Sequence, residues 1–98
     1  MSVTITSPPD GSSVSSVFQV SGSVDTSKGV PTVSGQAVSG MNVVNGAVTK
    51  APTASDPTFT VKFDTSAYSG QGLKWSVKIA ADYGGGVIDT ATVHVTTP

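Results

Sequence analysis

Apolar and polar residues alternate along several segments of the chain, which is the pattern of strands that bury one face. In the N-terminal half the alternation is clear over Ser2–Ser7 and Val17–Val24. Pro8-Pro9-Asp10-Gly11 separates these segments with residues that favour turns. Gly22 falls on the apolar face of the second segment, so we expect another part of the molecule, such as an aromatic ring, to approach its backbone closely.

The C-terminal half alternates more strongly, over Phe59–Phe63, Leu73–Ala81 and Ala91–Val95. Trp75 shares the apolar face of the second of these segments, so the periodicity predicts a tryptophan in the core. His94 falls on the polar, outward face of the last segment.

The middle of the chain is less regular. Thr32–Val38 is compatible with a strand, although it contains a glycine. Asn45-Gly46 is a dipeptide favoured in two-residue type I′ turns, so we predict a hairpin over Val44–Ala47. Two prolines in Lys50–Pro57 predict a loop.

Composition supports the same interpretation. Valine, serine, threonine and glycine make up more than half of the 98 residues, and leucine occurs once. Such a chain disfavours helices and favours short strands joined by turns. We therefore predict an all-β protein, an antiparallel β-sandwich of about seven strands, with a small closed barrel as the alternative. Residues 1–98 form one domain in this prediction, and 96–98 are the start of a linker.

Charge and cysteine content exclude several classes of function. The net charge is −1, with five lysines, six aspartates, no arginine and no cysteine. This composition argues against nucleic acid as a partner and rules out disulfides and thiolate metal sites. No apolar run is long enough to span a membrane, and no signal peptide is visible. We expect a monomer in isolation.

Catalytic chemistry has little support in the sequence. A catalytic serine needs a histidine base, and the one histidine, His94, lies on the outward face of the last predicted strand. Glycoside hydrolysis needs two carboxylates facing each other across a cleft, whereas the aspartates fall in or beside loops. We therefore predict no catalytic residues and no enzymatic activity.

Two kinds of ligand deserve consideration. Asp25 and Asp82 would form a calcium site if their loops meet at one end of the molecule, although aspartates in turns usually bind their own backbone. Otherwise we expect no cofactor. A carbohydrate site on a sandwich needs exposed aromatic rings, for which Tyr68, Tyr83 and Trp75 are the candidates.

Six segments together have the order and motifs of a known family: Val3–Gly11, Val20–Val24, Val44–Gly46, Phe59–Val61, Gly72–Asp82 and Ala91–Val95. They resemble bacterial immunoglobulin-like (Big-type) domains, which begin with a strand, a Ser-Pro turn with glycine and a Val-x-Gly strand, and continue with a Val-Asn-Gly hairpin. The last two strands also resemble the ending of a fibronectin type III domain, but the early tryptophan of that family is missing.

The resemblance implies an immunoglobulin-like sandwich that acts as a non-catalytic spacer or adhesion module of a larger extracellular or cell-surface protein. Its partners would be neighbouring domains of the parent chain and, for an adhesion unit, a glycan or another cell-surface ligand. The alternatives are a carbohydrate-binding accessory module of a polysaccharide-degrading enzyme and a decoration domain of a phage particle.

Overall fold

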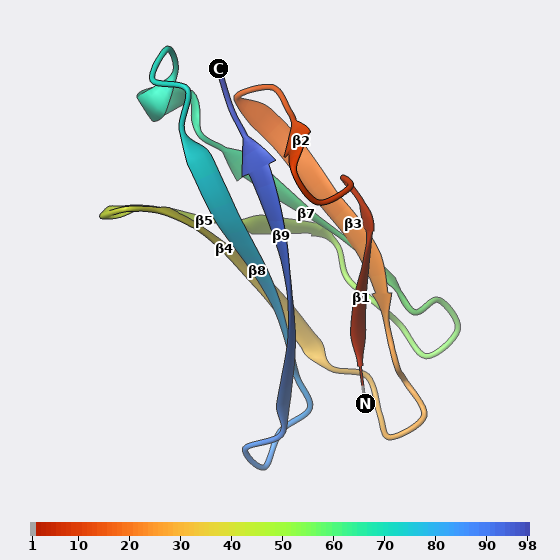
Figure 1. The fold of residues 1–98 in the computed structure, drawn as a ribbon. Coiled ribbons are helices and arrows are strands. Elements are labelled where there is room, and N and C mark those ends of the chain that lie inside the picture. The colour runs from red at the N-terminus through yellow and green to blue at the C-terminus, as the bar shows by residue number, and fades with distance from the viewer. Residues whose placement is uncertain (1) are drawn as a thin grey trace.

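The computed structural model describes residues 2–98, and these residues form strands connected by loops and one short 3-10 helix (Figure 1). The elements in chain order are β1 (Val3–Ser7), β2 (Ser12–Ser13), β3 (Val17–Val24), β4 (Thr32–Ser39), β5 (Asn42–Asn45), β6 (Ala47–Lys50), β7 (Thr58–Asp64), η1 (Ser66–Tyr68), β8 (Lys74–Asp82) and β9 (Ile88–Thr96). The prediction of an all-β protein is therefore confirmed, and the bounds of β3 are those predicted.

The strands form two sheets that face each other. One sheet has the order β1-β3-β7-β6 and the other the order β2-β9-β8-β4-β5. Every pairing is antiparallel except that of β2 with β9, which is parallel. Because each sheet has its own two edge strands, the described strands form a sandwich-like pair of sheets and not the closed barrel that was the alternative.

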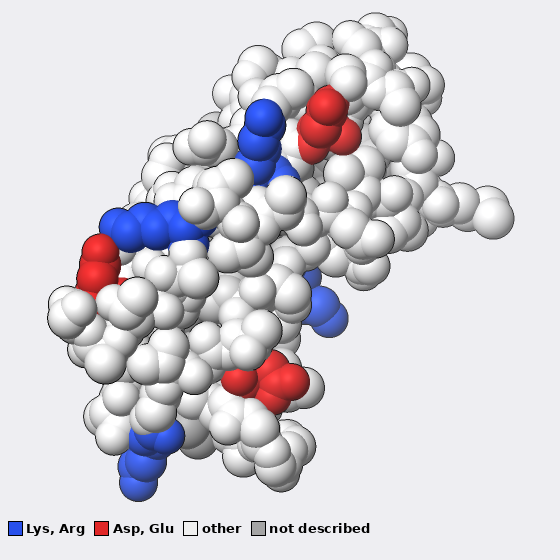
Figure 2. All heavy atoms as spheres, turned by 180° about the vertical axis from the view of Figure 1, so that it is seen from behind, with Lys and Arg blue, Asp and Glu red and all other residues white. Residues whose placement is uncertain are grey.

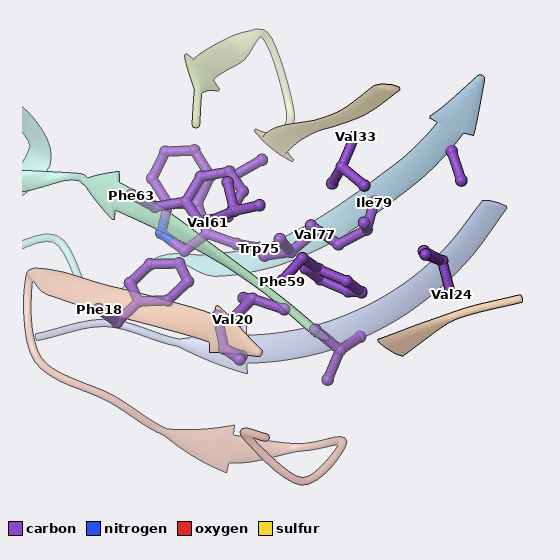
Figure 3. Packing of buried hydrophobic residues seen from close by; sticks show 14 residues of the cluster. Phe18, Val20, Val24, Val33, Phe59, Val61, Phe63, Trp75, Val77 and Ile79 are labelled. Carbon is purple, nitrogen blue, oxygen red and sulfur yellow. The ribbon is translucent and has the colours of Figure 1, made fainter. Parts of the chain in front are cut away.

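The core lies between the two sheets, as the alternation predicts. Phe18 and Phe63 stack with ring centroids 5.3 Å apart, and Trp75 lies beside them (Figure 3). Burial of side chains of this size contributes about 1.5–3 kcal/mol each relative to an exposed position. The buried apolar residues are Phe18, Val20, Val24, Val33, Ala37, Phe59, Val61, Phe63, Trp75, Val77, Ile79, Ala81, Val93 and Val95.

Gly22 has the close neighbours that its place in the sequence predicts. A Cβ atom there would lie 2.8 Å from the Cζ of Phe59 and 1.9 Å from the carbonyl oxygen of Thr4. The missing side chain therefore lets the Phe59 ring and the edge strand β1 both approach β3.

The predicted hairpin at Asn45-Gly46 is wrong. β5 pairs with β4 in one sheet, whereas β6 pairs with β7 in the other, so the chain changes sheets at Gly46. Glycine is needed there because a Cβ would lie 2.4 Å from Cγ1 of Val61 in the core. The hairpin lies one strand earlier, where Gly40, with φ +58°, and Met41 connect β4 to β5.

The C-terminal residues predicted to begin a linker are held by the folded body. Thr96 is the last residue of β9, and the Thr97 side chain is 3% exposed. The Thr97 amide donates to the carbonyl of Leu73, and the Pro98 carbonyl accepts a hydrogen bond from the Gly70 amide. These contacts join the last residues to the loop that precedes β8.

Candidate functional site

Trp75 is part of the core, as its periodicity predicts, and is 1% exposed. The Tyr68 ring packs edge-to-face against it with centroids 5.6 Å apart. The indole Nε1 donates a hydrogen bond of 2.9 Å to the Thr97 hydroxyl. An indole buried in this way has no free face on which a sugar ring could stack.

Tyr83 lies at the other end of β8 from Tyr68 and is partly buried. Its hydroxyl donates to the backbone carbonyl of Asp25, and burial raises the pKa of the phenol. The nine residues of β8 separate the two tyrosines by roughly 30 Å along the strand. The three aromatic candidates therefore do not form one binding platform.

Asp25 follows β3 and Asp82 is the last residue of β8, and both lie at the same end of the sandwich, where the Tyr83 hydroxyl donates to the Asp25 carbonyl. Each carboxylate, however, accepts a hydrogen bond from its own loop. Asp25 Oδ1 accepts from the Ser27 amide at 2.9 Å, and Asp82 Oδ1 accepts from the Gly84 amide at 2.8 Å. The bond from Ser27 lowers the pKa of Asp25.

Within residues 2–98, no three His, Cys, Asp or Glu side chains are grouped so that they could hold a metal ion. A calcium site that uses Asp25 and Asp82 stays a prediction.

His94 is exposed on the outer face of β9, where the sequence predicts it, and its hydrogen-bond partner is Asp10. Asp10 Oδ1 accepts from the His94 amide at 2.7 Å and lies 2.9 Å from Nδ1 of the ring. These bonds lower the pKa of Asp10. In addition, the Gly11 amide donates to the His94 carbonyl at 2.7 Å, so the pair fastens the turn before β2 to β9. Beside this turn lies an open hollow of about 230 Å³.

A second hollow, of about 280 Å³, opens on the outer face of the five-stranded sheet. It forms where β5 leaves the sheet, and the Gln36 amide donates to the Asn45 side chain at 3.2 Å on its rim. The sequence did not point to it, because it depends on the change of sheets at Gly46. Its lining residues are Ser34, Gly35, Gln36, Asn45, Lys78 and Ala80. These groups offer hydrogen bonds and one cation, with no aromatic ring.

On the face that Figure 2 shows, charged side chains are scattered and do not gather in one patch. One ion pair joins Lys50 and Asp56, with 2.9 Å between Nζ and Oδ2. Within residues 2–98, the most exposed large apolar side chain is Met41, which is 99% exposed at the tip of the β4–β5 hairpin, and Val43 nearby is 49% exposed.

No family model matches the chain, and no curated protein matches it. Among the described residues, no helix has the length and apolar character needed to cross a bilayer.

Proposed function

We propose that this chain is a non-catalytic immunoglobulin-like module of a larger extracellular or cell-surface protein, in which it acts as a spacer or adhesion unit. The strand orders support the immunoglobulin-like part of this proposal. The order β1-β3-β7-β6 corresponds to strands A-B-E-D of that fold, and β9-β8-β4 corresponds to G-F-C. β5 takes the place of the additional strand that variable-type domains carry beside strand C.

The position of the two chain ends is the observation that carries the spacer role. The molecule measures 42 × 23 × 20 Å. The chain enters β1 at one end of the long axis and leaves β9 at the opposite end (Figure 1). A module built in this way adds its full length between the domains on either side and leaves both flanks accessible.

The contact between β2 and β9 supports a role under tension. Ser12 and Ser13 pair in parallel with Val95 and Thr96, and the Val14 amide donates to the Thr96 carbonyl at 2.9 Å. Pulling on the two ends draws these parallel segments in opposite directions along their length. The bonds between them must then break together, which resists force better than breaking them one after another.

Single-molecule pulling through the two ends tests this function. Val14→Pro removes the amide that donates to Thr96, so we expect a lower unfolding force than for the unmodified chain. Val14→Ala is the matched control, because it shortens the side chain and keeps the amide. Pulling the unmodified chain through the tip of the β4–β5 hairpin gives a reference force. The spacer role is contradicted if pulling through the two chain ends needs no more than this reference force. It is also contradicted if Val14→Pro and Val14→Ala change the unfolding force equally.

The carbohydrate-binding alternative has less support, because Trp75 is buried and the two tyrosines lie far apart. Affinity electrophoresis on common polysaccharides provides its test. Retardation that Tyr68→Ala or Tyr83→Ala abolishes would favour it over the spacer role. The genes adjacent to the coding sequence would distinguish a virion module from a cell-surface module.

A further inference from the structure

The four edge strands of the two sheets differ in how they are protected from pairing with another chain. Natural edges are kept from pairing by charges, prolines, bulges or short length. β2 has two residues, β1 has an irregularity between Ile5 and Ser7 and runs into two prolines, and β6 has an irregularity before Lys50. β5 is also short, with four residues, but it carries no charge, no proline and no irregularity, and its register with β4 is continuous.

The chain segment that contains β5 carries no charged residue, and it exposes apolar side chains. Residues 29–49 contain no lysine and no aspartate. The β4–β5 hairpin projects from the body of the molecule (left of Figure 1), and the same projection, seen from behind, carries no coloured side chain (right of Figure 2). Met41 at its tip and Val43 on its outer face are exposed. An edge strand that exposes neighbouring apolar side chains is more typical of an interface with another chain than of an edge that faces water.

Backbone groups of β5 point away from β4 at every second residue. In an antiparallel ladder, residues that exchange both hydrogen bonds alternate with residues that exchange none. The Gly46 amide donates to the Gly35 carbonyl at 2.9 Å, which sets the phase of this alternation. Gly46 opposite Gly35 is thus a hydrogen-bonded pair, and the pairs alternate from there toward the start of β5. Asn45 and Val43 therefore fall at the positions that make no backbone hydrogen bonds to β4. Their amides and carbonyls therefore face the open edge.

We propose that β5 pairs antiparallel with β5 of a second copy of this chain, across a two-fold axis perpendicular to the sheet. Such an interface brings each residue opposite its own counterpart or a near neighbour. Like charges would then face each other and repel, so an edge strand without charged residues suits this pairing. Opposing side chains must also lie on the same face of the joined sheet. Val43 opposite Val43 of the second copy meets both conditions and joins the two five-stranded sheets into one.

The size of β5 sets the strength expected of this dimer. The strand has four residues, so the interface is smaller than the roughly 1,200 Å² at which stable complexes begin. We therefore expect a weak dimer that forms as the concentration rises, in place of the monomer expected for the isolated module.

Sedimentation equilibrium of the 98-residue chain over micromolar to millimolar concentrations tests the proposal. Val43→Lys would place two ammonium groups opposite each other, so we expect it to weaken association at least tenfold. Val17→Lys is the matched control, because Val17 is similarly exposed, at 42%, on the outer face of the other sheet. Thermal melting confirms that both variants are folded.

Cysteine cross-linking tests the register, because the chain has no cysteine of its own. Residues opposite each other in an antiparallel pair have Cα atoms about 4.5–5.5 Å apart, within the range that a disulfide spans. We expect Val43→Cys to give a covalent dimer on mild oxidation and Val17→Cys to stay monomeric. A chain that is monomeric at millimolar concentration, or a dimer that Val43→Lys leaves unchanged, would overturn the proposal, and the edge would then serve a different partner or none.

Discussion

The hydrogen bond between Trp75 and Thr97 is the best place to test how the end of the chain contributes to stability. Both side chains are buried, and the Thr97 hydroxyl accepts the indole hydrogen at 2.9 Å. Thr97→Val keeps the shape of the side chain and removes this acceptor. The indole N–H then stays in the core, where neither water nor another side chain can replace the lost partner.

An unsatisfied buried donor costs about 1–3 kcal/mol of stability. With a central value of about 2 kcal/mol, the melting temperature of a domain of this size should fall by roughly 8–16 °C. Thr97→Ser keeps the hydroxyl and removes one methyl group, so it should cost only about 1 kcal/mol. Thr92→Val, at an exposed position of β9, should have little effect.

Urea denaturation followed by tryptophan fluorescence is a suitable assay, because Trp75 is the one tryptophan of the chain. We expect the midpoint to fall in Thr97→Val while the dependence on urea concentration stays constant. If Thr97→Val is as stable as Thr92→Val, the hydroxyl does not satisfy the indole.

Two further predictions concern the edge strand β1 and the response to acid. Gly22→Ala places a Cβ only 1.9 Å from the carbonyl oxygen of Thr4, so we expect it to displace β1 and lower the melting temperature. Faster amide hydrogen exchange in β1 is the second readout. Hydrogen bonds from Thr58 and Lys50 lower the pKa of Asp56 to about 2. The stability that they provide is present above pH 4 and is lost as the pH falls toward 2, so melting curves of Asp56→Asn should depend less on pH in that window.

Much of the fold was predictable because the alternation and the tertiary structure agree. β3, β7 and β8 each pack one face on the core, so every second residue of these strands must be apolar. The same argument placed Trp75 in the core, and Gly22 pointed to a close ring that proved to be Phe59. In these segments, local sequence and long-range packing favour the same conformation.

The failures occur where a distant contact overrides the local signal. Asn45-Gly46 favours a tight turn, but Gly46 is required by Val61, which belongs to the opposite sheet. β2 has two residues and so has no period to detect. The Thr-Thr-Pro ending predicted the start of a linker, and sequence alone could not show that Thr97 continues the inward phase of Val93 and Val95 and binds the Trp75 indole.

The change of sheets at Gly46 also connects the two proposals. It ends β5 after four residues, so the edge that would pair with a second copy is short and lies on the flank of the sandwich, away from both chain ends. A two-fold axis perpendicular to the sheet reverses every direction within that sheet, including the long axis of the molecule. Two modules paired through β5 would therefore run in opposite directions, as modules do when their parent proteins extend from surfaces that face each other. A weak contact of this kind gains strength when many copies act together, so the proposed pairing would let the proposed spacer also hold two such surfaces together.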